Sequence, residues 1–211
     1  DSEPFHIYCY DFDNSGNLDI VLGYYQKGTC YPLRGRQCSS DQMPFIKKKF
    51  PTYQDFATAS LKDVYGDKLE KATHYAANNF ESVYIENLGN GQFKMKALPQ
   101  RLQISIINDM LSKDFDGDGN IDILAAGNLF TAEVETPRSD AGIGLFLKGD
   151  GNGNFTPVTV NQSGFYAPGD VKDLSIIRLA DGTQAVIAAN NDDLMTIHRI
   201  KNTNTNLVTE K

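Results

Sequence analysis

The chain contains two nine-residue segments in which acidic side chains alternate with other residues. The segment Asp114-Phe-Asp-Gly-Asp-Gly-Asn-Ile-Asp122 places carboxylates at positions 1, 3, 5 and 9 of a glycine-bearing loop. The segment Asp11-Phe-Asp-Asn-Ser-Gly-Asn-Leu-Asp19 repeats this frame, with Ser15 at the position that Asp118 holds in the other. Calcium takes six to eight oxygen ligands at about 2.3–2.6 Å, and alternate residues of a tight loop can point inward together. The spacing therefore predicts two calcium sites, of which the first has one carboxylate fewer and binds more weakly.

Two alternatives compete with this interpretation. An EF-hand requires a bidentate Glu at position 12 and a helix on each side, but position 12 is Ala125 in one loop and Leu22 in the other. The apolar, strand-like runs after both loops also argue against it. The second alternative is an aspartate-rich turn without metal, since Asp, Asn and Gly favour turns. Converging carboxylates repel one another without a cation, so we favour the metal sites and expect Asp116→Ala to cost more calcium affinity than Asp13→Ala.

A repeat of about 60 residues organises the elements that must position these loops. Asn87-Leu-Gly-Asn-Gly-Gln-Phe93 and Gly149-Asp-Gly-Asn-Gly-Asn-Phe155 both predict hairpin turns between strands, and their final phenylalanines are 62 residues apart. Asp181-Gly-Thr-Gln-Ala-Val-Ile-Ala-Ala-Asn-Asn191 aligns with the second loop at an offset of 63. This third copy has Ile177, Leu179 and Ala185 at ligand positions, so we expect it to keep the turn and bind no calcium.

The two acidic loops are 103 residues apart, which leaves about 40 residues beyond one repeat. The pattern of these additional residues predicts several short helices. Thr52/Asp55, Ser60/Asp63 and Asp67/Glu70 each place a capping residue three positions before an acid, as at a helix start. We therefore predict that residues 28–80 form a helical insertion on one face of a β scaffold.

Each repeat predicts about four antiparallel strands, with the acidic loop between the first two. Such units repeated along a chain favour a β-propeller. The alternative is an array of β-sandwiches, which would not require a period of this size.

At this point the motifs resemble a known family. Asp114 to Leu124, followed by Gly144-Leu-Phe-Leu-Lys-Gly-Asp-Gly-Asn-Gly-Asn-Phe155, is similar to the FG-GAP/VCBS repeat of integrin α-subunit and cartilage acidic protein-like propellers. The resemblance covers residues 5–27 and 81–200. The segment Gln42 to Ala57 resembles one found in VCBS-repeat proteins of Bacteroidetes-type bacteria.

The resemblance implies a seven- or eight-blade propeller with calcium in the loops between the first and second strands. The ligands that carry over are Asp11, Asp13, Ser15, Asn17 and Asp19 in the first loop, and Asp114, Asp116, Asp118, Asn120 and Asp122 in the second. Ser15 departs from the acid usual at that position. Three units are too few to close a propeller, so we expect the remaining blades upstream, in a longer protein.

These observations divide the chain into expected segments. They are 1–27 with 81–100 as the first blade, 28–80 as the helical insertion, 101–161 as the second blade, 162–200 as a third, degenerate blade, and 201–211 as a polar tail.

Composition narrows the classes of partner. The net charge is −7, which disfavours nucleic-acid binding because that needs a basic patch. The one basic run, Lys47 to Lys49, is expected on a solvated helix face. No apolar run reaches the ~18 residues that a transmembrane helix needs.

The three cysteines bear on the cellular compartment. Cys30 and Cys38 are close enough in sequence for a disulfide, which would imply an oxidising compartment. Cys9 alternates within a predicted strand and is expected to be a buried free thiol. Calcium sites of millimolar affinity also suit an extracellular or cell-surface setting.

The sequence offers no catalytic constellation. His6, His74 and His198 show no metal spacing and are expected to be structural, and no nucleophile-elbow or phosphate-loop motif is present. The leading hypothesis is a secreted or surface-attached calcium-binding module that binds protein or glycan. The alternatives are the propeller part of an extracellular glycan-active enzyme and a structural subunit whose helical insertion docks onto a surface complex.

Overall fold

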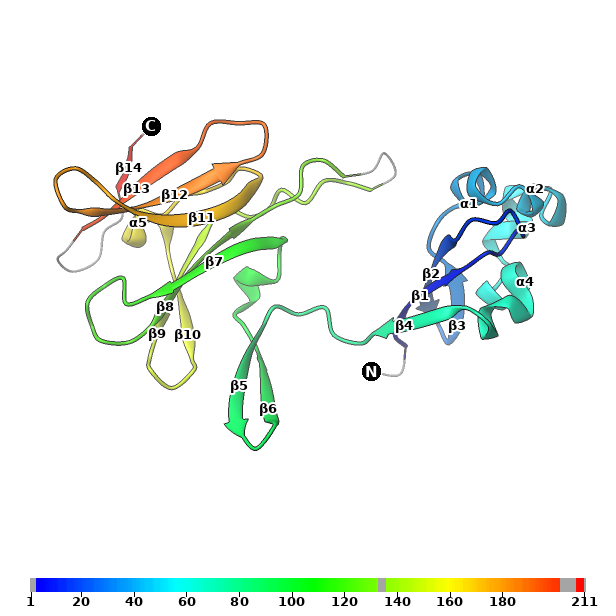
Figure 1. The fold of residues 1–211 in the computed structure, drawn as a ribbon, viewed down its shortest axis with the longest axis horizontal. Helices are drawn as coiled ribbons and strands as arrows, with labels where there is room; N and C mark the ends of the chain where they lie inside the picture. Colours follow the sequence, from blue (N-terminus) through cyan, green and yellow to red (C-terminus); the bar gives the residue numbers. More distant parts are fainter. Residues whose placement is uncertain (1–2, 133–135, 202–207, 211) are drawn as a thin grey trace. The chain divides into compact units, whose positions relative to one another are not determined.

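The computed structural model describes residues 3–132, 136–201 and 208–210. The chain folds into two compact units, Asp1–Phe80 and Glu81–Lys211 (Figure 1). The described residues are mostly β, in four antiparallel sheets. The expected β-rich fold is therefore confirmed, while the described residues do not show a closed propeller.

A four-stranded sheet forms the base of the first unit. Its strands are β1 (Phe5–Tyr10), β2 (Asp19–Gln26), β3 (Thr29–Pro32) and β4 (Thr73–Ala77), in the order β3-β2-β1-β4. The first three strands follow one another as a meander, and the fourth returns to pair with β1. Every second residue at the start of β2 is buried, as expected for a strand that covers a core with one face. Residues 28–80 thus supply two strands of this sheet as well as helices.

Five short helical segments lie between β3 and β4. They are α1 (Arg36–Gln42), α2 (Phe45–Lys49), α3 (Tyr53–Ala57), α4 (Leu61–Tyr65) and the 3-10 helix η1 (Gly66–Glu70). Capping boxes at Thr52/Asp55 and Ser60/Asp63 confirm two of the predicted helix starts. The third prediction was wrong, because η1 already begins at Gly66 and has no capping side chain.

The helices pack against the sheet through an apolar core to which both contribute side chains. Phe12 and Val21 come from the strand side, and Ile46, Val64 and Tyr65 from the helices. All five are almost fully buried. The first acidic loop therefore belongs to a unit whose core is shared between strands and helices.

The second unit contains a hairpin and two four-stranded sheets. The hairpin is β5 (Val83–Gly89) with β6 (Gln92–Ala97), followed by the 3-10 helix η2 (Gln100–Leu102). One sheet has β7 (Ile107–Lys113), β8 (Asp122–Gly127), β9 (Leu145–Gly149) and β10 (Phe155–Val158). The other has β11 (Val171–Arg178), β12 (Gln184–Asn190), β13 (Thr196–Ile200) and β14 (Val208–Glu210), and the short helix α5 (Val160–Ser163) connects the two sheets.

The two sheets repeat one another in detail. Each is an antiparallel meander of four sequential strands. The first pairing in each sheet carries a register shift near its start, between Ile107 and Asp109 and between Val171 and Asp173. These bulges are 64 residues apart, close to the period in the sequence.

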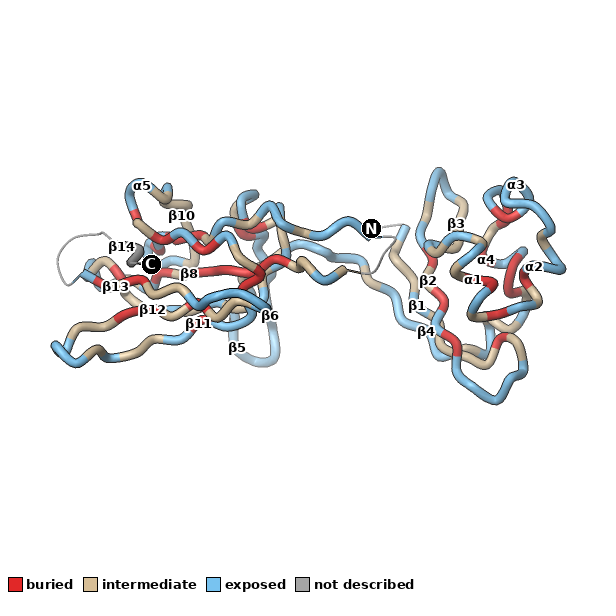
Figure 2. The backbone as a smooth tube through the Cα atoms, turned by 90° about the horizontal axis from the view of Figure 1, so that it is seen from above, coloured by how far each residue is buried: buried red, intermediate tan, exposed pale blue. Residues whose placement is uncertain are grey.

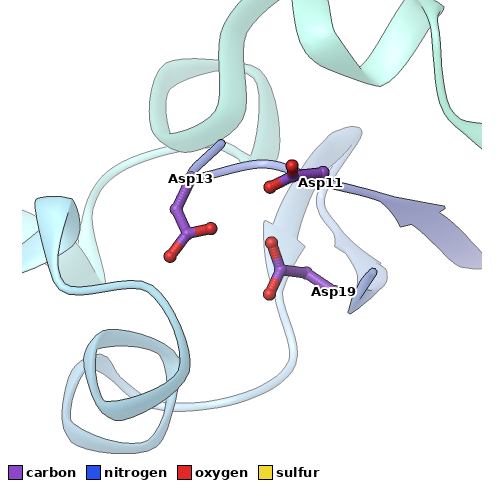
Figure 3. Close-up of side chains that lie close together, drawn as sticks. All are labelled: Asp11, Asp13 and Asp19. Carbon is purple, nitrogen blue, oxygen red and sulfur yellow. The ribbon is translucent and has the colours of Figure 1, made fainter. Parts of the chain in front are cut away.

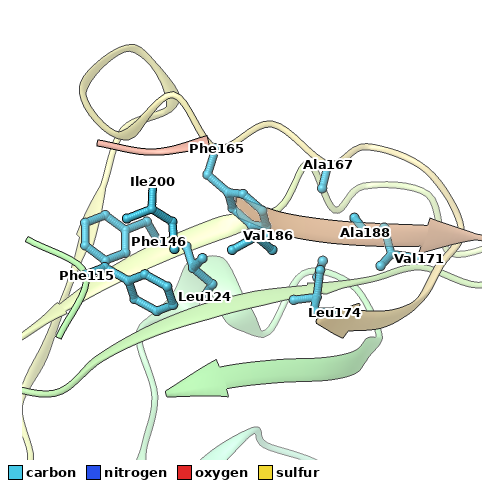
Figure 4. Packing of buried hydrophobic residues seen from close by; sticks show 11 residues of the cluster. Phe115, Leu124, Phe146, Phe165, Ala167, Val171, Leu174, Val186, Ala188 and Ile200 are labelled. Carbon is cyan, nitrogen blue, oxygen red and sulfur yellow. The ribbon is translucent and has the colours of Figure 1, made fainter. Parts of the chain in front are cut away.

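The repeated sheets pack face to face around an apolar cluster (Figure 4). Leu124 and Phe146 from one sheet meet Val186 and Ala188 from the other, with Phe165 between them fully buried. β8 is the most continuously buried strand of its sheet, as the burial colours of Figure 2 show. The second acidic loop ends at the first residue of this strand.

Some segments differ from their expected places. Residues 201–211, expected as a polar tail, include β14, which completes the last sheet beside β13; residues 202–207 and 211 lie outside the described part. Residues 1–27 and 81–100, expected to form one blade, fall in different compact units. That they complete a common blade stays a prediction.

Candidate metal centres

The two acidic loops fold with the same hydrogen-bond frame. The amide of the position-6 glycine, Gly16 or Gly119, donates to the first aspartate at 2.9 and 3.0 Å. The position-5 amide donates to the position-3 carboxylate at 3.0 and 3.1 Å. The position-7 amide donates to the position-5 side chain at 3.4 and 2.8 Å. The agreement in frame that the sequences show is thus an agreement in backbone path.

Positions 4 and 6 explain why these loops need their small residues. Gly117 and Gly119 have φ of +79° and +90°, and Gly16 has +87°. Asn14 adopts φ of +60° at position 4 of the first loop, and asparagine tolerates this region better than most residues. Two left-handed residues per loop curl the chain so that its carboxylates turn inward.

A phenylalanine at position 2 anchors each loop to the core beneath it. Phe12 packs its ring 5.0 Å from that of Tyr65 in α4, and Phe115 lies edge-to-face with Phe146 of β9 at 6.2 Å. Both phenylalanines are buried. The Asp-Phe-Asp opening therefore alternates carboxylates that face the centre of the loop with a ring that faces the core.

The ninth-position aspartates close the loops. Asp19 and Asp122 accept the amide hydrogen of the position-2 phenylalanine at 2.9 and 3.0 Å. The second oxygen of Asp122 accepts from the Gly149 amide at 2.9 Å, whereas that of Asp19 accepts from the Gln42 side chain at 3.3 Å. Burial raises the pKa of Asp122 despite these two backbone bonds, and the charges of Asp116 and Asp118 raise it further.

Three carboxylates converge in each loop. Asp11, Asp13 and Asp19 each offer an oxygen within 4.8 Å of the others, and Figure 3 shows the three groups directed toward a common space. Asp114, Asp116 and Asp122 form the equivalent group. Opposite oxygens around one calcium ion are up to about 5 Å apart, so both groups have the dimensions and the donor type for a hard cation.

The remaining predicted ligands lie outside the two groups of three carboxylates. Ser15 Oγ and Asp118 Oδ1 each accept a backbone amide within their loops. Asn17 and Asn120, the residues predicted to offer backbone carbonyls, donate these amide hydrogens. Backbone bonds, that of Gly16 foremost, hold the pKa of Asp11 below its usual value, which keeps it ionised.

A lysine forms ion pairs with two carboxylates of the second loop. Lys148, near the end of β9, forms an ion pair with Asp116 and a second with Asp118 at 2.8 Å. The paired carboxylates raise the pKa of Lys148, and Lys148 lowers that of Asp118. The sequence analysis missed this residue. No sequence pattern indicates it, because Lys148 reaches the loop only through the strand register that pairs Ile123 with Leu147.

The first loop also has a lysine neighbour, but on different atoms. Lys68 Nζ of η1 lies 2.8 Å from the carbonyl oxygen of Phe12 and 2.9 Å from the side-chain oxygen of Asn14. These are positions 2 and 4 of the loop, between the carboxylates of the alternating frame. Lys68 therefore supports the loop backbone and leaves the three converging carboxylates to other cations.

The third turn, between β11 and β12, has no comparable cluster among the described residues. Asp181 accepts from the Thr183 amide at 2.9 Å and pairs with Arg199 at 3.0 Å. Ala185 is fully buried in β12. The turn is retained, and its single carboxylate is neutralised by an arginine.

The cysteines and the buried histidine complete the sites considered in the sequence. Cys9, Cys30 and Cys38 are free thiols, so the Cys30–Cys38 disulfide that the sequence allows is not formed in this structure. Cys30 lies on β3 beside Gly23, and the Cys38 sulfur instead contacts Arg34 at 3.7 Å. His198 is fully buried against Phe165, and burial lowers its pKa.

An apolar pocket of about 330 Å³ lies in the second unit. Its walls come from residues 101, 102, 104–107, 125–127, 141–145, 158 and 160. Arg101 is the one ionisable residue of this lining, so the pocket presents an apolar surface and no acid–base pair.

Over the described residues, no helix is both long and apolar enough to cross a membrane. Comparisons with protein-family models, curated proteins and solved structures find no match. The resemblance to FG-GAP/VCBS repeats therefore rests on the quoted motifs alone.

Proposed function

We propose that the chain is a calcium-binding β-repeat module of a secreted or cell-surface protein, which binds a protein or glycan partner. The observation that carries this proposal is the pair of loops with one sequence frame, one hydrogen-bond frame and one cluster of three carboxylates each. A chance acidic turn would have no reason to recur with the same backbone path beside a different core.

The donor set favours calcium among the common ions. Every candidate ligand is an oxygen, from carboxylates, a hydroxyl or backbone carbonyls, and hard cations prefer oxygen. Magnesium requires nearly ideal octahedral geometry and keeps several waters. Nine-residue loops with acids at alternate positions instead offer many ligands in a flexible arrangement, which suits the larger ion.

The role of calcium in this proposal is to pin the turn between the first two strands of a sheet. Asp122 already joins the loop to β9 through Gly149, and Asp19 joins its loop to α1 through Gln42. A bound ion would add the carboxylates at positions 1 and 3 to the same cross-link. Since the unfolded chain lacks such a cluster, binding would stabilise the folded state.

We further propose that the repeated sheets are blades of a β-propeller. The two successive four-stranded meanders, with bulges at equivalent places, support this arrangement. A propeller would present its loops on two opposite faces, where a protein or glycan partner could bind. The choice of partner class follows from the resemblance to adhesion-type repeats and is a hypothesis of analogy.

Calorimetric titration of the whole chain with calcium tests the proposal. We expect two sites in the native protein, weaker binding at the first loop in Asp13→Ala, weaker binding at the second loop in Asp116→Ala, and weaker binding at both in the double variant. Asp181→Ala is the matched control, because it removes an exposed aspartate from the equivalent turn of the third repeat. The absence of binding heat, together with equal melting temperatures in calcium and in chelator, would refute the calcium function.

A further inference from the structure

Two histidine rings meet across the edge of the first unit's sheet. His6 Nδ1 on β1 lies 2.8 Å from His74 Nε2 on β4, although the two residues are 68 positions apart in sequence. The register pairs His6 with Ala76 and Tyr8 with His74. The histidines are therefore diagonal neighbours on the same face of adjacent antiparallel strands, within reach of one another.

The short contact restricts the protons that the pair can carry. A hydrogen bond of this length between two neutral imidazoles needs one N–H and one lone pair. Two protonated rings would place two N–H donors against each other. The arrangement thus holds two ring nitrogens 2.8 Å apart. One ion that accepts both lone pairs could replace the shared proton.

The separation matches a metal chelate. Two imidazole nitrogens at about 2.0–2.1 Å from one ion lie about 2.9 Å apart at a right angle and about 3.4 Å apart at the tetrahedral angle. The observed 2.8 Å agrees with the right angle, which square-planar and octahedral ions use. We propose that His6 and His74 form a binding site for a divalent transition-metal ion, Cu²⁺ or Ni²⁺ before Zn²⁺, with water completing its coordination.

The surroundings hold the two rings ready for such an ion. Tyr8 stacks on His74 with ring centroids 4.4 Å apart and an interplanar angle of 13°. Tyr25 lies 5.6 Å and Tyr8 5.7 Å from the His6 ring. His74 is exposed while His6 is half-buried, so an ion could arrive from solvent at rings whose rotation is already restricted.

Burial shifts the pKa values of several groups around the pair. Burial foremost, and then the neighbouring His74, lower the pKa of His6. Tyr8 and Cys30, on the same face, have pKa values raised by burial and remain neutral near pH 7. Tyr25 is the third titratable side chain next to the pair.

The proposed site is chemically separate from the acidic loops. It offers nitrogen donors, which suit borderline transition metals, while the loops offer oxygen donors for hard cations. A metal at this site would join β1 to the edge strand β4 and so close the chain segment that contains all the helices of the first unit. We expect the ion to stabilise the first unit for this reason.

Copper and nickel binding by the tag-free intact chain tests the inference, with excess Ca²⁺ present to occupy the carboxylate loops. We expect one tight site by calorimetry and, for Cu²⁺, an electron paramagnetic resonance spectrum with coupling to two imidazole nitrogens. His74→Gln removes an exposed ligand and is expected to weaken Ni²⁺ binding on the order of 10²-fold, because a chelate becomes a single contact. His6→Gln should do the same.

The controls distinguish this site from others in the chain. Cys30→Ser and Asp13→Ala are expected to leave nickel affinity unchanged, and the buried His198 stays in place in every variant. Circular dichroism without metal verifies that each variant is folded. Nickel affinity in His74→Gln equal to that of the native protein, or a copper spectrum of the native protein with coupling to fewer than two nitrogens, would overturn the proposal.

Discussion

The two acidic loops follow the same backbone path, yet their carboxylates meet different neighbours. In the second loop, Lys148 forms ion pairs with Asp116 and Asp118. In the first, Lys68 binds a backbone carbonyl and the Asn14 side chain, and leaves the carboxylates of Asp11 and Asp13 without that contact. The loop with more acids is thus also the loop whose acids are partly neutralised.

This difference shows that the number of carboxylates in a loop does not alone determine its affinity. A calcium ion that enters the second loop must displace the Lys148 ammonium, whose side chain is 44% exposed and can extend into solvent. An ion entering the first loop displaces no such group from its three converging carboxylates. Counting charges predicts tighter binding by the second loop, whereas the ion pairs of Lys148 reduce the expected advantage.

The largest expected effect distinguishes the closing aspartates. Asp122→Ala removes the partner of two backbone amides, those of Phe115 and Gly149, from a fully buried place. Each unsatisfied buried group costs about 1–3 kcal/mol, so we expect the free energy of unfolding to fall by about 2–5 kcal/mol. Asp19→Ala should cost less, because only one backbone amide depends on Asp19. Urea denaturation measures the free energy of unfolding of both variants, and equal losses would contradict the expected difference between the loops.

Removing the lysine tests the comparison directly. Lys148→Gln eliminates the cation that competes for Asp116 and Asp118, and one unit of charge near an exposed site changes binding by roughly 1–2 kcal/mol. We expect calcium affinity at the second loop to rise about tenfold at low salt. Lys68→Gln is the matched control, which should change affinity at the first loop by much less. Calorimetry that shows equal effects would contradict the distinction.

The position-3 aspartates offer a smaller difference. Asp116→Ala is expected to weaken calcium binding more than Asp13→Ala, because its loop relies on one more carboxylate. The difference in lost calcium affinity between the two variants should be small in the native background, where Lys148 partly neutralises the second loop. It should be larger in the Lys148→Gln background. Titration of the four variants tests this, and a gap that does not widen would show that the lysine has no influence on the site.

The smallest effects concern the backbone. Gly16→Ala and Gly119→Ala place a side chain at φ near +90°, which costs about 1–2 kcal/mol. Asn14→Gly gives the first loop the residue type of the second at position 4 and should change stability by less than about 0.5 kcal/mol. Thermal unfolding compares them. If Asn14→Gly lowers stability more than either alanine variant does, the Lys68–Asn14 contact contributes more than backbone strain costs.

Local signals in the sequence were sufficient for several features. The two loops, the capping boxes at Thr52 and Ser60, and the hairpin turn at Asn90-Gly91 with its positive φ values all formed where their motifs indicated. Each depends on contacts between residues within a few positions of one another. Their physical causes, a capping hydroxyl or a left-handed residue, are therefore visible in a short stretch of sequence.

Local sequence patterns did not predict the pairing of strands that are far apart in the chain. The return of β4 to β1 joins segments separated by the helices, and β14 joins residues that read as a polar tail. The Asp67/Glu70 pattern gave no capped helix, since the preceding helix α4 ends at Tyr65 and η1 follows without a break. Edge pairing and packing decided these elements.

The amino-acid sequence by itself determined that two loops of this chain gather carboxylates at alternate positions, because that spacing and its glycines act within nine residues. The tertiary structure alone decided what surrounds those carboxylates. Strand register brought Lys148 to one loop and helix packing brought Lys68 and Gln42 to the other. It also brought His6 to His74. These contacts arise from sheet pairing and core burial, which join residues that no local pattern connects.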